Sequence, residues 1–281
     1  MKNLINLKSV GLLASLVLMA MVFSCTKESG VLYEEVEYST DNEHLKSISI
    51  NGIVVDKYFY DHAGRIVEYN SEFSCSKYLY DTKGCLVKVE SAVDVNGLLS
   101  SSYYPGKKEL MTFKNSTLTS FSLYKYDQNE RLSKIENYFK GTDQKFEYAS
   151  MRTFEYKGSL IVKVNWHDHA GKITQFYVYA YDDRGNVINE KYYSCHDGSV
   201  LMYETSYKYD DYKNPFRIFC MTGSPGTYTN INNVIKTRCT YTHTLGVPGV
   251  YSYSNSTTTY QYNKNGYPAK IIGESGLEYK Y

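Results

Sequence analysis

The sequence predicts an all-β protein, an antiparallel up-and-down meander of hairpins that rolls into a barrel or shell. Of the 281 residues, 32 are Tyr, and many recur as Tyr-x-Tyr, which alternates with the period of a strand. Turn signals follow at intervals of about 10–12 residues, so we expect roughly 15–20 strands. A twisted open sheet of that size curls or closes.

The composition excludes two classes of protein. Hydrophobic residues make up 42% and aromatic residues 16% of the chain, enough apolar surface to form a packed core, so intrinsic disorder is excluded. Lys and Arg number 31 against 30 Asp and Glu, for a formal net charge of +1. Without a basic excess or a basic run, no nucleic-acid partner is expected.

The first 25 residues predict a secretory signal. Lys2 and Lys8 precede an apolar run from Val10 to Phe23, roughly 14 residues, whereas a helix that crosses a bilayer needs about 20. The run ends in Val22-Phe23-Ser24-Cys25, which resembles the lipobox of bacterial lipoproteins. An ordinary signal peptide with a chance Cys is the alternative.

This resemblance implies the organisation of the chain. Residues 1–24 are expected to be a lipoprotein signal peptide, Cys25 the lipidated residue, 25–44 a lipid-anchored linker and 45–281 a single β domain. The lipid would hold the protein at the outer membrane, facing the periplasm or exposed at the surface. Both orientations stay open, and the oligomeric state is not predicted.

The β domain is built from a repeat. Clear copies of Tyr-x-Tyr-Asp-x-x-Gly, followed within two residues by an aliphatic or aromatic residue, span residues 58–66, 78–86, 179–187 and, with Asn in place of Asp, 260–267. Less regular copies span residues 124–132, 154–160, 166–173 and 207–210. A fixed unit of this kind indicates one supersecondary element repeated along the chain.

Each unit is expected to form a hairpin. Asp at the first turn position accepts a backbone N–H, and Gly three residues later takes the left-handed conformation of a three-residue loop with a bulge. The register then places Asp61 opposite Arg65, Tyr60 opposite Ile66 and Tyr58 opposite Glu68. Where Glu130 replaces Gly, we expect a looser turn. The turn-forming pairs are Asp61 and Gly64, Asp81 and Gly84, Asp168 and Gly171, and Asp182 and Gly185.

The strand alternation predicts which face of the sheet is exposed to solvent. Positions opposite the Tyr face include Lys125, Glu155, Lys208 and Gln261, whereas a barrel that spans a membrane needs an outward apolar band about 25 Å tall. Tyr and aliphatic side chains should therefore point inward, as a core or as the lining of a cavity.

The repeat resembles the Tyr-Asp repeat, also called YD or RHS-type, of bacterial shell and wall-associated proteins. The resemblance covers most of residues 50–281, although 91–122 and 221–256 match poorly. With the lipobox, the chain resembles a family of lipoproteins of unknown function with a porin-like fold. This resemblance implies a rolled β architecture and no activity.

Candidate chemical sites are few. His167-Asp168-His169 has residue types that bind zinc, but Asp168 aligns with the turn Asp and His169 with an ordinary turn position, so neither a metal nor a cofactor is expected. Five Cys remain besides Cys25, an odd number that leaves at least one thiol free. A bond between Cys220 and Cys239 stays open.

Two functional classes remain. The first is a non-enzymatic envelope lipoprotein that binds a glycan or an envelope protein through Tyr-rich strands, since Tyr offers a rigid ring and a hydroxyl at low entropic cost. The alternatives are a glycan hydrolase with paired carboxylates and a purely structural scaffold in which Tyr fills the core. Candidate binding residues are Tyr58, Tyr60, Tyr78, Tyr80, Trp166, Tyr179 and Tyr181.

Overall fold

The computed structural model describes residues 44–94, 109–196, 198–244, 247–273 and 276–281. Within these residues the chain forms 17 strands and one 3-10 helix, η1. They are β1 (Ser47–Ile50), β2 (Ile53–Tyr60), β3 (Ile66–Ser71), β4 (Ser74–Tyr80), β5 (Leu86–Val93), β6 (Ser120–Tyr126), β7 (Leu132–Lys140), β8 (Phe146–Lys157), β9 (Leu160–His167), β10 (Ile173–Tyr181), β11 (Val187–Ser194), β12 (Val200–Lys213), η1 (Pro215–Thr222), β13 (Asn232–Thr244), β14 (Val247–Thr257), β15 (Thr259–Tyr262), β16 (Pro268–Ile272) and β17 (Leu277–Lys280).

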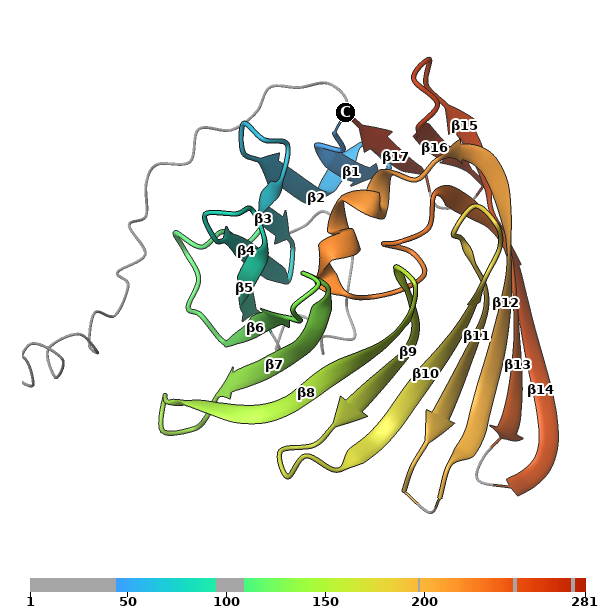
Figure 1. The fold of residues 1–281 in the computed structure, drawn as a ribbon. Helices are drawn as coiled ribbons and strands as arrows, with labels where there is room; N and C mark the ends of the chain where they lie inside the picture. The colour runs from blue at the N-terminus through green and yellow to red at the C-terminus, as the bar shows by residue number, and fades with distance from the viewer. Residues whose placement is uncertain (1–43, 95–108, 197, 245–246, 274–275) are drawn as a thin grey trace, which may run out of the picture. The chain divides into compact units, whose positions relative to one another are not determined.

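The strands form one antiparallel sheet that is a nearly closed barrel (Figure 1). Each strand pairs with the next from β1 to β14 and from β15 to β17, and β1 also pairs with β17. Only Thr258 separates β14 from β15, and its N–H donates to the carbonyl of Ile235 on β13 at 2.9 Å. The expected meander, and the expected number of strands, are confirmed.

The turn chemistry is also as expected. In the first unit the Gly64 N–H donates to the Asp61 carbonyl and the Arg65 N–H to Asp61 Oδ1, both at 2.9 Å. Gly64 has φ 73°, in the left-handed region that Gly adopts without steric cost. The same pair of bonds recurs at the turns that begin at Asp81, Asp168, Asp182 and Asn263.

The expected register is wrong at one pair. Tyr60 lies opposite Ile66 as predicted, but Tyr58 lies opposite Tyr69 rather than Glu68. The cause is a bulge, since Phe59 pairs with Glu68 and leaves Val67 without a partner in the ladder. The bulge brings the rings of Tyr58 and Tyr69 together on one face, 5.4 Å apart between centroids.

The looser turn expected at Glu130 is not found. Glu130 takes the left-handed conformation with φ 59°, and its N–H donates to the Asp127 carbonyl at 3.0 Å, as Gly does elsewhere. Asp127 holds this turn from its first position, because it accepts the Arg131 N–H at 3.0 Å and forms an ion pair with the Arg131 guanidinium at 2.8 Å. Asp61 makes the same two contacts with Arg65 in the turn that contains Gly64, so Glu130 is accommodated without a change in the turn.

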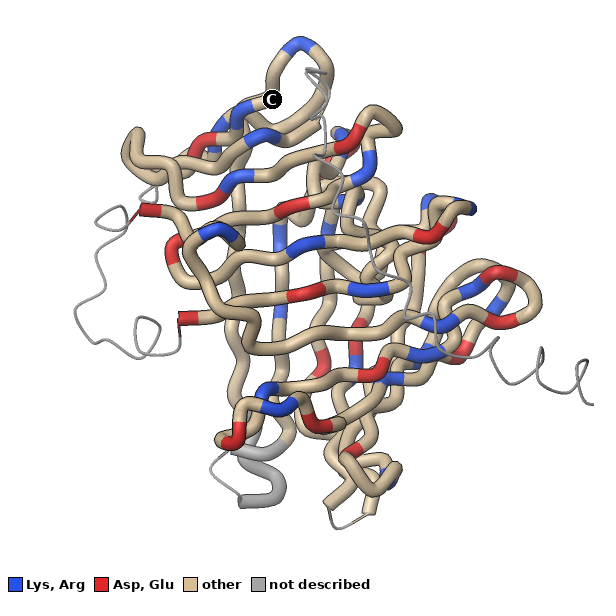
Figure 2. The backbone as a smooth tube through the Cα atoms, turned by 90° about the vertical axis from the view of Figure 1, so that its left-hand side faces the viewer, with Lys and Arg blue, Asp and Glu red and all other residues tan. Residues whose placement is uncertain are grey.

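The outer face of the barrel carries charge. Lys125, Glu155, Lys208 and Gln261 are all exposed, as expected. Charged residues of both signs lie along neighbouring strands (Figure 2), and several form ion pairs across them, such as Lys125 with Glu136 at 2.8 Å. No helix in the described ranges is long and apolar enough to cross a membrane.

The connection between β12 and β13 folds into the barrel (Figure 1). We call residues 214–231 the plug. It begins with η1, whose first turn is capped by Asn214 Oδ1, the acceptor for the Phe216 N–H at 3.0 Å. Phe219 of the plug is buried among the barrel tyrosines. The sequence pattern does not predict η1. Its only sign in the sequence is that residues 221–256 match the repeat poorly.

The plug crosses the barrel interior. Its Phe219 ring lies 5.8 Å from Tyr58 on β2 and 6.1 Å from Tyr78 on β4. A Cβ atom added at Gly223 would collide with Leu132 on β7 and would lie 2.9 Å from Phe154 on β8. Gly223 therefore lets the plug backbone pass close to the side chains of Leu132 and Phe154.

The core consists of three buried clusters of Tyr and aliphatic side chains. The first surrounds Phe219 of the plug, the second lies at Ile135 and Leu86, and the third lies at Val164 and Val187. Met221 of the plug packs against the first two. Because plug and barrel side chains share these clusters, the Tyr-bearing face is the inner face of the barrel.

Candidate binding site

The second Tyr of the repeat has a defined bonding partner. The hydroxyls of Tyr60, Tyr80 and Tyr181 donate to the backbone carbonyls of Leu45, Ile66 and Ile161, at 2.7, 2.8 and 2.6 Å. The same bond is made by Tyr126 to Leu86, Tyr156 to Leu132, Tyr209 to Val187 and Tyr281 to Pro268. In the unit at 260–267 the first Tyr, Tyr260, makes this bond, to Val234. In each case the acceptor precedes the donor in the chain, by 13 to 40 residues.

The first Tyr of the repeat packs in the interior. Tyr58 and Tyr179 are 7% and 9% exposed and belong to core clusters. Tyr78 lies against Phe219 of the plug. Of the seven binding candidates from the sequence, Trp166 alone stands outside these two groups, as a half-buried ring on the inner face of β9.

A row of four tyrosines crosses the inner face beside Trp166. Tyr177, Tyr192, Tyr203 and Tyr241 are direct cross-strand partners on β10, β11, β12 and β13. Successive ring centroids are 5.0, 5.0 and 6.1 Å apart. We call these residues the tyrosine row.

The tyrosine row faces the barrel interior. Tyr177 lies two residues from the buried Tyr179, so both side chains point to the same face of β10. At the far end of the row Tyr241 is 39% exposed. Burial raises the pKa of Tyr177 and Tyr203, which therefore remain protonated hydroxyls at neutral pH.

Sequence reasoning missed the tyrosine row because only Tyr177 belongs to a Tyr-x-Tyr unit, and the partners of the row meet through strand register. The usable signal was the period of two on β10, which places Tyr177 on the same face as Tyr179 and Tyr181.

Polar groups extend the tyrosine row toward β8. The Tyr192 hydroxyl donates to Gln175 Oε1 at 2.9 Å. Gln175 is the cross-strand partner of Trp166, and Trp166 is that of Arg152. The inner face therefore carries a continuous strip of rings and polar side chains from β8 to β13.

Arg152 is a cation inside the barrel. Its guanidinium lies 5.1 Å from the centroid of the Trp166 ring, and burial lowers its pKa. Nη1 reaches Ser224 Oγ of the plug at 3.4 Å, while Nε is buried without a hydrogen-bond partner. No carboxylate forms an ion pair with Arg152 among the described residues.

A cavity of about 340 Å³ opens at Arg152, between the inner face and the plug. We call it the Arg152 cavity. Barrel tyrosines and plug aromatics make most of its wall, and the guanidinium is the one formal charge among the residues that line it. The lining residues are Tyr58, Tyr69, Tyr78, Val89, Tyr124, Arg152, Phe216, Phe219, Thr222, Ser224 and Tyr228.

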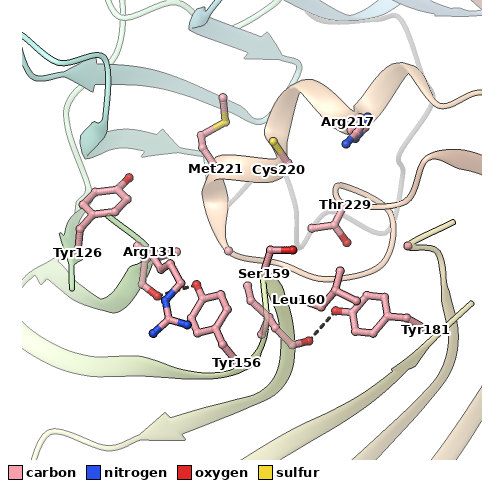
Figure 3. A pocket seen from close by; sticks show the side chains of 14 residues that line it. Tyr126, Arg131, Tyr156, Ser159, Leu160, Tyr181, Arg217, Cys220, Met221 and Thr229 are labelled. Atoms are coloured by element: carbon pink, nitrogen blue, oxygen red, sulfur yellow. Dashed lines mark hydrogen bonds between the residues drawn. The ribbon is translucent and has the colours of Figure 1, made fainter. Parts of the chain in front are cut away.

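A second cavity of about 420 Å³ lies between the plug and the hairpin turns (Figure 3). Its barrel wall includes Tyr156, whose ring is 4.8 Å from the Arg131 guanidinium, and Arg131 is neutralised by Asp127. Arg217 and Cys220 line it from the plug, and both are exposed. We call this the turn-side cavity.

Among the described residues, Glu190 and Asp56 are acids on the inner face of the barrel. Glu190 on β11 is the cross-strand partner of Tyr179 on β10 and lies near Tyr203 and Tyr207. Burial raises the pKa of Glu190. Burial likewise raises the pKa of Asp56, which accepts a hydrogen bond from the Tyr69 hydroxyl at 2.7 Å.

The sequence His167-Asp168-His169 forms a turn. Asp168 Oδ1 accepts the N–H groups of Ala170 and Lys172, both at 2.9 Å. The His167 ring nitrogens lie 3.0 Å from Thr153 Oγ1 and 3.1 Å from the Gly171 carbonyl. Across the described part of the chain, no group of three or more His, Cys, Asp or Glu is placed to hold a metal ion.

The cysteines in the described part are free thiols, including Cys220 and Cys239, whose pairing the sequence left open. The predicted lipidation site, Cys25, lies outside the described residues.

No protein-family model and no curated protein matches the sequence. Among solved structures, a porin-like protein from Bacteroides vulgatus is 12% identical with a TM-score of 0.50, over 85% of this chain and 98% of that chain. A porin-like protein from Bacteroides uniformis is 11% identical, over 84% and 97% of the two chains, with a TM-score of 0.44. A protein of unknown function from Bacteroides fragilis is 14% identical, over 46% and 88%, with a TM-score of 0.34. The likeness to the Bacteroides vulgatus protein shows that the fold is a porin-like barrel.

Proposed function

We propose that the protein is a non-enzymatic lipoprotein of the cell envelope whose barrel binds a glycan chain along the tyrosine row. The observation that carries this proposal is the row itself. Four rings stand in register on the inner face, and the outermost, Tyr241, is 39% exposed. The repeat tyrosines, in contrast, are used in the core and in bonds to backbone carbonyls.

The chemistry of the row suits a sugar chain. Aromatic faces stack on the apolar faces of sugar rings, and phenol hydroxyls exchange hydrogen bonds with sugar hydroxyls. Gln175 adds an amide next to Tyr192, and Trp166 adds a larger ring beside it. A row that crosses four strands offers successive contacts, which favours an extended chain over a single sugar.

The side chains of the tyrosine row and its extension favour binding over hydrolysis. Glycoside hydrolysis requires two carboxyl groups on either side of the scissile bond. The tyrosine row and its extension contribute Tyr, Gln, Trp and Arg, while Glu190 is set among tyrosines on the adjacent level of the wall.

Two features support the proposed location. The lipobox-like residues 22–25 supply an anchoring signal, and the charged outer face of the barrel suits contact with water rather than with lipid. The glycan would then come from the space around the membrane that holds the anchor.

Titration of the full-length protein in detergent with soluble neutral polysaccharides, such as a β-glucan, an α-mannan and a xyloglucan, tests the proposal. Binding is followed by calorimetry. The double variant Tyr192→Ala, Tyr203→Ala should lose at least tenfold in affinity, because it removes the two central rings. The control Tyr253→Ala removes a ring that is 70% exposed outside the row and should bind like the wild type.

Equal binding by both variants would overturn the tyrosine row as the binding surface. Release of shortened oligosaccharides during the titration would favour the hydrolase alternative.

A further inference from the structure

The tyrosine row does not account for the charge of Arg152 inside the barrel. A buried guanidinium is stable in a protein when acids or several hydrogen bonds compensate for its lost hydration. Arg152 has the Trp166 ring, one long contact to Ser224 at 3.4 Å, and a buried Nε without a partner. The compensation within the described residues is therefore incomplete.

Arg152 lines the Arg152 cavity. The cavity has about 340 Å³, within the range of about 300–1,000 Å³ in which small molecules bind. Apart from Arg152 itself, its walls come from two sources, the inner faces of strands β2 to β6 and the plug. The plug thus gives this part of the barrel wall a second, facing wall.

We propose that the Arg152 cavity binds a carboxylate carried on a six-membered ring. The guanidinium would hold the carboxylate through its Nη groups, the paired geometry that Arg offers to planar anions. Ring faces such as those of Tyr124 and Phe219 would enclose the ring of the ligand.

The charge of the site selects a carboxylate over a phosphate. One guanidinium balances one negative charge, and a phosphate monoester at neutral pH carries more than one. Among the aliphatic hydroxyls of the wall, Thr222 Oγ1 already donates to the Phe219 carbonyl at 2.8 Å, which leaves Ser224 beside Arg152. A monoanion with a flat or sugar-like body fits both the charge and the walls.

The turn-side cavity lacks these properties. Arg131 is paired with Asp127 at 2.8 Å, and Arg217 is exposed on the plug. Arg217 is therefore a useful control, since it is a cation on the wall of the neighbouring cavity.

The site is independent of the proposed glycan chain, because a small carboxylate needs only the cavity. The two sources of the ligand chemistry are a uronic sugar and an aromatic acid. They are separated by titrating the full-length protein in detergent with D-galacturonate, with D-galactose as its neutral counterpart, and with phenylacetate. Trp166 is the single tryptophan of the chain and lies 5.1 Å from the guanidinium, so its fluorescence reports occupancy directly.

We expect saturable fluorescence changes with one or both carboxylates and none with D-galactose. Arg152→Met, which keeps the length of the side chain and removes the charge, should weaken carboxylate binding at least tenfold, whereas Arg217→Met should bind like the wild type. Thermal melting of each variant monitors folding, and Arg152→Met should melt no lower than the wild type, because it removes a buried charge.

Three results would overturn the proposal: equal saturable responses to D-galacturonate and D-galactose, no response to either carboxylate, or loss of binding in Arg217→Met but not in Arg152→Met. If Arg152→Met melts early, Arg152→Lys replaces it. That variant keeps the cation without the planar fork and should bind carboxylates more weakly than the wild type. The double variant Tyr192→Ala, Tyr203→Ala should retain carboxylate binding, so failure of the glycan proposal remains distinguishable.

Discussion

The hydroxyl of Tyr80 donates a 2.8 Å hydrogen bond to the backbone carbonyl of Ile66, 14 residues earlier in the chain. Tyr80 is the last residue of β4, and Ile66 is the first residue of β3 in the hairpin before it. The bond therefore ties consecutive repeat units together at the turn end of the barrel. It explains why the second Tyr of the unit recurs as Tyr rather than Phe.

Removing this bond should destabilise the barrel. In Tyr80→Phe the ring packing stays and only the hydroxyl is lost, so we expect the free energy of unfolding to fall by about 1–2 kcal/mol. Chemical denaturation measures the change. Tyr253→Phe, on an exposed ring, is the matched control; equal stability of the two variants would contradict a bonding role for the Tyr80 hydroxyl.

Truncating a core Tyr should cost more than truncating one in the tyrosine row. Tyr58 is 7% exposed, whereas Tyr241 is 39% exposed. Tyr58→Ala is expected to lower stability by about 3–5 kcal/mol, as other large-to-small core substitutions do. Tyr241→Ala should have a much smaller effect. Similar melting temperatures for the two variants would show that the row is part of the core.

Replacing Gly in one turn should destabilise the protein, whereas introducing Gly in another turn should not. Gly185 has φ 91° and open space where a Cβ atom would lie, so Gly185→Val isolates the backbone strain, about 1–3 kcal/mol. Asp183→Val, at an exposed position in the same turn, should cost little. Glu130→Gly should not destabilise the protein, because Glu130 already has φ 59°. Thermal melts of the three variants test these expectations.

Glu190 should make stability depend on pH. Burial raises its pKa above the ordinary value of 4.5, so the folded state binds the proton more tightly than the unfolded state does. Stability therefore falls as pH rises from about 4.5 through the higher folded pKa. Glu190→Gln should melt higher than the wild type at pH 7 and like it at pH 4.

The exposed Glu109 provides the control for this experiment. Glu109→Gln should leave the pH profile of the melting temperature unchanged. A Glu190→Gln variant with the wild-type profile would show that Glu190 is solvated in the folded state.

Cys25 should determine where the protein is found. The lipobox-like residues 22–25 predict that Cys25→Ala abolishes lipidation, so the variant should leave the detergent phase in phase partitioning or accumulate unprocessed. Cys239→Ala is the control thiol. Recovery of the wild type in the aqueous phase would remove the lipoprotein assignment.

Much of the fold follows from local sequence. Tyr-x-Tyr alternation places rings on one face of a strand, and Asp with Gly three residues later closes the hairpin through bonds within five residues, such as those of Asp61 with Gly64 and Arg65. Those interactions are short in sequence, so a single copy reveals them, and the repetition then implies a rolled sheet.

The tertiary structure determines the strand register, the side chains that meet across the barrel and the position of the plug. The bulge at Val67 changes the partner of Tyr58 from Glu68 to Tyr69. The tyrosine row and the meeting of Arg152 with the plug depend on strand pairing around the barrel and on a connection that folds back into it. The repeat marked Tyr58 and Tyr80 as aromatic positions, but only packing against Phe219 and bonding to Ile66 gave them their roles. Side chains distant in sequence come into contact only when the sheet has curled, so a local sequence pattern does not predict those contacts.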